Sequence, residues 1–138
     1  MKYRIVRLII PLFAGVLFSC GNNQQSDLFD PDSDNIQLVL FHLETSCASC
    51  DAVKNETLAV MENSFPEEVN AGEIRFVAMN FSDKGGREAA ELLRATGQSF
   101  YIVKGETVVN LTSDAFMFAN THPQRFRDTL KNEIQKLR

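Results

Sequence analysis

The chain has 138 residues, 44% of them hydrophobic, and its net charge at pH 7 is -4. This length and composition favour one globular domain with an ordinary core and argue against a disordered protein. The first 19 residues contain basic but no acidic side chains, so the remainder of the chain is more acidic still. That balance argues against nucleic acid or an anionic membrane surface as a partner, since both attract clustered Lys and Arg.

The N-terminus has the pattern of an export signal. Basic residues precede an apolar stretch, residues 8–18, that is too short to span a bilayer as a stable helix. The sequence LFSCG at its end resembles the bacterial lipoprotein signal, in which a small residue precedes a cysteine that is acylated and becomes the new N-terminus. The resemblance implies that residues 1–19 are a lipoprotein signal peptide and that a lipid on Cys20 anchors the protein in the membrane. A plain signal peptide and a retained anchor are the alternatives.

The segment after the anchor is polar. Residues 20–35, with the sequence CGNNQQSDLFDPDSDN, are acidic and nearly free of periodic apolar positions, which is typical of a flexible tether. We therefore expect a tether to hold one domain, residues 36–138, away from the membrane. The domain of such an exported protein lies in the periplasm or at the surface of the bacterial cell envelope.

Lipidation also accounts for the odd number of cysteines. The chain has 3 cysteines, and a lipid on Cys20 leaves Cys47 and Cys50 as a pair within the sequence CASC. A disulfide between them would close a very short loop and would constrain the unfolded chain little. Chemistry therefore explains the pair better than structural stabilisation does.

The first half of the domain predicts two strands around a helix. The apolar run IQLVLFHL at 36–43 predicts a buried strand that ends just before the cysteines. A helix follows, with capping hydroxyls from Thr45 and Ser46, until Pro66 interrupts it. The run IRFVAMNF at 74–81 then predicts a second buried strand. The positions at helical spacing are Val53, Thr57, Val60 or Met61, and Ser64 or Phe65.

The second half predicts a helix, a hairpin and a final helix. A Gly-Gly break opens the first of these helices, REAAELLRAT at 87–96. FYIV at 100–103 and TVVNL at 107–111 flank a turn and predict an antiparallel hairpin. Pro123 suits the first position of the final helix. The expected inward residues are Ala89, Leu92 and Leu93 in the first helix, and Phe126, Leu130, Ile134 and Leu137 in the last.

The order strand, helix, strand, helix, hairpin, helix is typical of an α/β fold with a parallel core and an antiparallel edge. An apolar strand that leads into C-x-x-C at the start of a helix, followed by this order, resembles the thioredoxin superfamily over residues 36–138. The resemblance implies a thioredoxin-like βαβαββα fold, with a central mixed sheet flanked by helices. No cofactor is expected.

The spacing of the two cysteines has a chemical purpose. On a first helical turn, their sulfurs can come within bonding distance, while the helix N-terminus offers unpaired N–H groups to the first one. Such a placement can lower a thiol pKa from about 8.5 into the range of roughly 3.5 to 7.5. We therefore expect Cys47 to be the nucleophile and Cys50 to resolve the mixed disulfide. A closed zinc site needs four ligands, and only His42 and His122 could join the pair, so no metal site is firmly predicted.

Three features depart from the general thioredoxin pattern. The chain has no Trp, and Phe41 stands where those proteins carry a buried carboxylate. Gln98 or Ser99 takes the place of the cis-proline that faces the cysteines there, so a trans peptide bond is expected. His42 and Glu44 are the candidates for moving protons in place of the missing carboxylate.

A closer resemblance covers these departures together. The stretches FHLETSCASC and FPEEVNAGEIRFVAMNF, with the segment from Phe100 through the last helix, resemble Bacteroides-type lipoproteins encoded beside arsenic-resistance genes and described as nitrophenyl-compound nitroreductase subunits. Ala48 and Ser49 depart from the proline-containing version of that CxxC. The resemblance implies a thioredoxin-like lipoprotein linked to arsenic resistance.

Two functions follow from the same sulfur atoms. The first is a membrane-anchored thiol-disulfide oxidoreductase, which passes electrons from an upstream dithiol donor to a protein or small-molecule acceptor. The alternative is a binding protein, in which Cys47 and Cys50 capture a soft metal or metalloid such as copper or arsenic. Reversibility distinguishes them, because an oxidoreductase cycles through a disulfide while a capturing site must stay reduced.

Overall fold

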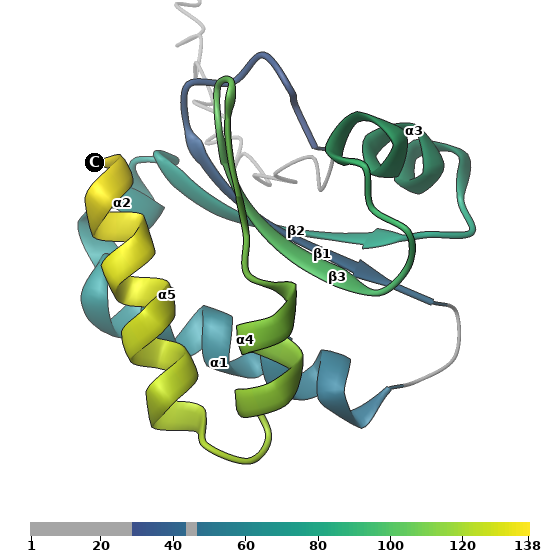
Figure 1. Cartoon of the computed structure of the whole chain (residues 1–138). Coiled ribbons are helices and arrows are strands. Elements are labelled where there is room, and N and C mark those ends of the chain that lie inside the picture. Colours follow the sequence, from purple (N-terminus) through teal and green to yellow (C-terminus); the bar gives the residue numbers. More distant parts are fainter. Residues whose placement is uncertain (1–28, 44–46) are drawn as a thin grey trace, which may run out of the picture.

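The computed structural model describes residues 29–43 and 47–138. They form a four-stranded sheet with helices on both faces (Figure 1). Within these residues, none of the helices is both long enough and apolar enough to cross a membrane. The strands are β1 (Ile36–His42), β2 (Ile74–Asn80), β3 (Ser99–Lys104) and β4 (Thr107–Asn110), and the helices are α1 (Ala48–Ser64), α2 (Pro66–Asn70), α3 (Lys84–Leu93), α4 (Thr112–Phe118) and α5 (Pro123–Leu137).

The strands pair in the order β2-β1-β3-β4. β1 is parallel to β2, antiparallel pairs join β1 to β3, and β3 is antiparallel to β4. Along the chain, α1 and α2 connect β1 to β2, as the crossover between two parallel strands requires. This arrangement confirms the predicted α/β fold with a central mixed sheet flanked by helices. Because β1 and β2 are parallel, their carboxyl ends lie at the same end of the sheet, and the chain leads from there into α1 and α3.

Two short helices are present that the sequence patterns did not predict. Pro66 does not simply end α1, because it also starts α2 after the buried Phe65. Proline suits this first position, where its missing N–H would have no partner in the helix. The second is α4, which follows β4 directly and buries Ala115. Its single buried position explains why no apolar stripe marked it in the sequence.

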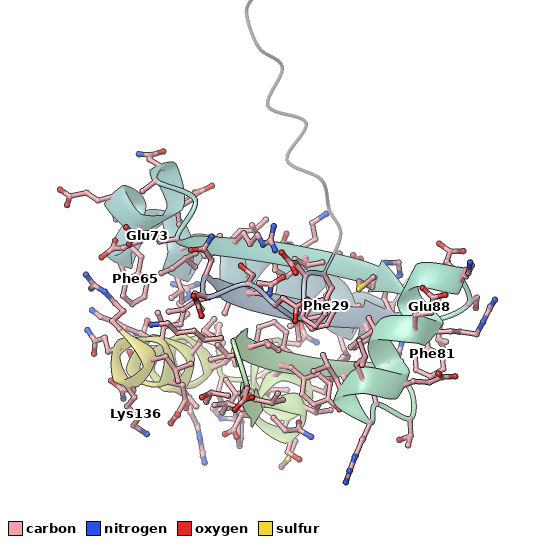
Figure 2. The ribbon with its side chains drawn as sticks, turned by 90° about the horizontal axis from the view of Figure 1, so that it is seen from above. Phe29, Phe65, Glu73, Phe81, Glu88 and Lys136 are labelled. Carbon is pink, nitrogen blue, oxygen red and sulfur yellow. The ribbon has the colours of Figure 1, made fainter. Side chains whose placement is uncertain are left out.

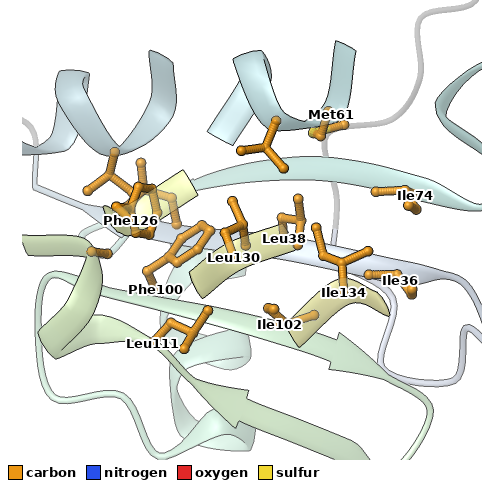
Figure 3. Close-up of a cluster of buried hydrophobic side chains, with 14 of the residues drawn as sticks. Ile36, Leu38, Met61, Ile74, Phe100, Ile102, Leu111, Phe126, Leu130 and Ile134 are labelled. Atoms are coloured by element: carbon orange, nitrogen blue, oxygen red, sulfur yellow. The ribbon is translucent and has the colours of Figure 1, made fainter. Parts of the chain in front are cut away.

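The first face of the sheet is covered by α1, α4 and α5 (Figure 1). Side chains from β1, β2 and β3 interdigitate there with those of the three helices, and Figure 3 shows Phe126, Leu130 and Ile134 of α5 against Leu38 and Phe100 of the sheet. The predicted stripe on α5 is confirmed, since those three residues are fully buried and Leu137 packs against the cluster. The stripe on α1 is confirmed at Val53, Thr57, Val60, Met61 and Phe65.

The second face is covered by α3, whose predicted register was partly wrong. The helix begins at Lys84, before the two glycines, and Leu92 is 63% exposed. Gly86 sets the register, because an added Cβ there would lie 1.9 Å from the backbone oxygen of Asn80. The inward face therefore runs from Gly86 through Ala89 and Ala90, and helical spacing turns Leu92 toward solvent.

The start of the described chain completes the second face. Phe29 packs against the cluster around Val39 and Phe41, and Figure 2 shows it over the sheet beside α3. The side chain of Gln37 is fully buried below it. The Gln37 amide donates to the Asp30 carbonyl at 2.6 Å and accepts the Asp30 N–H at 2.9 Å. Residues 29–35, the described part of the segment that we expected to be a tether, therefore lie against the domain.

Candidate active site

The two cysteines lie at the start of α1, after the chain leaves the carboxyl end of β1. Cys47 is the N-cap of the helix, with extended backbone angles, and Cys50 lies in its first turn. The helix begins at Ala48, so the capping position predicted for Thr45 and Ser46 belongs to Cys47. Thr45 and Ser46 themselves lie outside the described residues.

The Cys47 sulfur serves as the acceptor of its own helix cap. Its Sγ accepts the backbone N–H of Cys50 at 3.3 Å. The Cys50 thiol, the Cys50 N–H and the Ser49 N–H all favour the thiolate, and together they hold the pKa of Cys47 below its ordinary value. The side chain is also half-buried rather than covered. The lowered pKa and the partial exposure of Cys47 are features that suit a nucleophile.

Cys50 has the opposite character. It is 6% exposed, and this burial, with the neighbouring Cys47 sulfur as the next cause, raises the pKa of the Cys50 thiol to about 12. Both cysteines are free thiols in the structure. Cys47 is therefore the more easily ionised of the two thiols, and Cys50 keeps its proton to higher pH.

Gln98 and Ser99 lie just across from the helix start but play different parts. The Gln98 side-chain Nε2 donates to the Cys50 Sγ at 3.3 Å. The Ser99 hydroxyl is buried and donates to the Gly97 carbonyl at 2.9 Å, within its own turn. Their peptide bonds are trans, as expected without proline. Of the two residues, Gln98 is the one that contacts the dithiol.

The two candidates for proton transfer are placed less closely. His42 is half-buried at the end of β1, and its Nδ1–H donates to the Leu43 carbonyl at 3.0 Å. Glu44 lies outside the described residues. Phe41, at the place of the missing carboxylate, is fully buried and packs edge-on against Phe81 and Tyr101. The phenyl ring of Phe41 cannot take up a proton, so this position offers none of the acid–base chemistry of a carboxylate.

The metal-binding alternative would need donor groups beside the two sulfurs. Among residues 29–43 and 47–138, no three side chains of His, Cys, Asp or Glu are placed to hold one ion. His122, which we considered as a partner of the cysteines, is exposed at the start of α5 and lies edge-on to Phe118 at 6.1 Å. In this part of the chain the two sulfurs are therefore the only members of the predicted alternative site that lie together.

The sequence did not predict the hydrogen bonds at the two sulfurs, although it named Gln98 as a residue near the site. The cap made by the Cys47 sulfur has a local signal, since a cysteine at an N-cap has a backbone N–H three residues ahead. The Gln98 contact spans 48 residues of sequence, and only its place before the third strand pointed to it.

No protein-family model and no curated protein matches the chain. Among solved structures, the crystal structure of thioredoxin f2 from Chlamydomonas reinhardtii is similar to it, with 19% sequence identity and a TM-score of 0.41, over 62% of this chain and 75% of that chain. The fold assignment rests on the strand order and pairing described above. The adjacent Cys47 and Cys50 thiols on this fold fit a thiol-disulfide oxidoreductase.

Proposed function

We propose that the protein is a thiol-disulfide oxidoreductase that is held at the bacterial cell envelope through Cys20. The observation that carries this proposal is the contrast between the two sulfurs of one helical turn. Cys47 is half-buried with a lowered pKa, and Cys50 is buried with a raised one. One sulfur is prepared to attack, and the other is kept protonated until it is needed.

In the first step, the Cys47 thiolate attacks one sulfur of a substrate disulfide. A bond forms between that sulfur and the Cys47 Sγ, the substrate S–S bond breaks, and the second substrate sulfur leaves with the electron pair and takes a proton from water. The lowered pKa of Cys47 increases the fraction of this sulfur that is present as the attacking thiolate. The backbone N–H of Cys50 holds this sulfur in place for the attack.

In the second step, Cys50 resolves the mixed disulfide. Once Cys47 is bonded to substrate it no longer carries a charge, so one of the causes that raise the Cys50 pKa disappears. Cys50 then loses its proton to water and attacks the Cys47 Sγ. The Cys47–Cys50 bond forms, the bond to substrate breaks, and the substrate thiolate leaves and is protonated. The dithiol has been oxidised by two electrons and the substrate disulfide reduced.

The cycle needs a reductant, and a dithiol donor fits it. Its thiolate would reverse the exchange at the Cys47–Cys50 disulfide and restore both thiols. The placement of the domain outside the cytoplasm is supported by the sequence pattern at Cys20, which lies outside the described residues. An acidic domain on a lipid anchor suits a partner met at the membrane rather than one bound through basic patches.

The same contrast favours exchange over capture of a soft metal or of arsenic. A two-sulfur metal site needs both cysteines as thiolates. Each exchange step needs only one thiolate at a time, whereas capture needs both at once, and burial together with the neighbouring Cys47 sulfur opposes the ionisation of Cys50. The link to arsenic resistance therefore enters as an outcome of the test below.

The test is to trap the mixed disulfide. A full chain with Cys50→Ser, expressed in its own host and purified from the membrane, retains the attacking sulfur but cannot release its partner. We expect discrete adducts on a non-reducing gel that disappear with reductant and in a matched Cys47→Ser, Cys50→Ser control. The proposal fails if no adducts form while the wild-type chain stays reduced in glutathione buffers and binds arsenite with one ion per chain.

A further inference from the structure

Gln98 is fixed in front of the dithiol by the strand that follows it. Ser99 begins β3 and pairs with Phe41 of β1, in the centre of the sheet. The Ser99 hydroxyl also ties the preceding turn together through the Gly97 carbonyl. The backbone of Gln98 therefore has little freedom, and its half-buried side chain is held with the amide at the Cys50 sulfur.

The amide of Gln98 serves both sulfurs. Its Nε2 carries two N–H donors. One donates to the Cys50 Sγ at 3.3 Å, and the side chain also lowers the pKa of Cys47, as the smallest of the favourable contacts there. A carboxamide has no charge and does not titrate, so it can stabilise a thiolate on either sulfur without competing for the proton.

The resolving step makes the greatest demand on such a donor. Cys50 is buried, and the charge on its sulfur has little contact with water when it forms. The two sulfurs interact with each other, but the Cys47 sulfur is bonded to substrate at that moment. The Gln98 amide donates to the Cys50 sulfur and stays neutral throughout the step.

We propose that Gln98 is a further catalytic residue of the dithiol: its amide stabilises the Cys50 thiolate that attacks the Cys47–substrate disulfide. This inference rests on the proposed exchange function. In the step, the Cys50 proton goes to water, the Cys50–Cys47 bond forms, and the substrate sulfur leaves with the electron pair of the broken bond. Gln98 neither gives nor takes a proton. Loss of a hydrogen bond to a charged group is expected to slow the step roughly tenfold.

The experiment separates the two steps by rapid mixing with dithiobis(nitrobenzoate), an aromatic disulfide. The full chain is studied in detergent with Cys20→Ser, so that Cys47 and Cys50 are its thiols. Attack by Cys47 releases one coloured thiolate in a phase whose rate rises with reagent concentration. Attack by Cys50 on the Cys47 Sγ releases the second in a phase whose rate does not depend on that concentration. The second phase is followed as a function of pH.

Two substitutions test the amide. Gln98→Met keeps the length of the side chain and removes both donors, and we expect the second phase to slow about tenfold with its pH midpoint raised. Gln98→Glu places a carboxylate at the sulfur, and we expect a larger rise of the midpoint. The first phase should change by less than about twofold in Gln98→Met. The matched control is Gln124→Met, at an exposed glutamine on α5, which should leave both phases unchanged.

The outcomes distinguish this inference from the function on which it rests. If the wild type releases both thiolates and each Gln98 variant, folded by circular dichroism, has the same second phase as the wild type, the role of Gln98 is overturned and the exchange function stands. If the wild type itself shows no concentration-independent phase, both are overturned. If Gln98→Met slows the second phase without moving its pH midpoint, the effect is structural and the stabilisation of the thiolate is overturned.

Discussion

The two ends of β1 differ in how completely their polar side chains are hydrogen-bonded. At the amino end, the buried Gln37 amide is occupied on both sides, by the Asp30 backbone and by the Arg75 guanidinium at 2.8 Å. Beyond the carboxyl end, the Cys47 sulfur accepts the Cys50 N–H at 3.3 Å and remains only half-buried. A fully paired group stabilises one arrangement, whereas a sulfur with room for new bonds can change its partner.

The largest effect is expected at the carboxyl end, and on activity alone. Cys47→Ser removes the nucleophile, so the rate of reduction of dithiobis(nitrobenzoate) should fall more than about a hundredfold, since a serine hydroxyl is not ionised at neutral pH. The free energy of unfolding should change by less than about 1 kcal/mol, because the hydroxyl can still accept the Cys50 N–H. A Cys47→Ser chain that keeps the wild-type rate would contradict the assignment of this end as the reactive one.

Gly86→Ala tests the packing of α3 against β2 on the second face of the sheet. The new Cβ would meet the Asn80 backbone oxygen at 1.9 Å, so α3 must move away from β2, and we expect a loss of about 3 kcal/mol in urea unfolding. Gly85→Ala is the matched control one residue earlier, where the Cβ would find the Met79 Cε at 3.9 Å. That control should be neutral or stabilise the helix by up to about 1 kcal/mol. Equal losses in the two variants would refute the close approach.

Gln37→Met tests the amino end. The substitution keeps the volume but leaves the Asp30 N–H and the Asp30 carbonyl without their partner, which should cost about 2 kcal/mol of unfolding free energy. The exchange rate of the dithiol should not change, because the two ends are independent in this account. Gln135→Met, at an exposed glutamine of α5, is the control. A slower exchange rate in Gln37→Met would show that the ends are coupled.

The smallest effect concerns pH. Because the pKa of Cys50 is raised to about 12 in the folded chain, the unfolded chain loses the Cys50 proton first as pH rises. The contribution of Cys50 to stability is therefore complete below its unfolded pKa and is lost as pH rises toward the folded pKa. Between about pH 8 and about pH 10, a Cys47→Ala chain, in which burial still raises the Cys50 pKa, should lose about 1 kcal/mol more than a Cys47→Ala, Cys50→Ala chain in urea unfolding. Parallel pH curves for the two chains would contradict the raised pKa.

The sequence predicted the parts of the fold that repeat in a pattern. The strands alternate between two buried faces, and α1 and α5 keep one apolar stripe, so their residues carry the signal themselves. α4 buries only Ala115 as a helical residue, too little for a stripe. The outward turn of Leu92 follows from the contact of Gly86 with Asn80, which is a tertiary contact.

The sequence likewise predicted some features of the site and not others. The CxxC spacing and the expected helix start pointed to Cys47 and Cys50 directly. The hydrogen bond from Gln98 to Cys50 and the one from Gln37 to Asp30 join residues that only the folded structure brings together. Residue type alone does not mark such contacts, because glutamine is a common surface residue.

The most direct test of the central claim is the equilibrium of the dithiol with glutathione. The full chain with Cys20→Ser is incubated in buffers of graded ratios of reduced to oxidised glutathione, quenched with an alkylating reagent, and weighed by mass spectrometry. We expect a single two-electron transition between a doubly alkylated chain and a chain with a Cys47–Cys50 disulfide. A chain that stays fully reduced, or carries only glutathione on Cys47, at every ratio would contradict it.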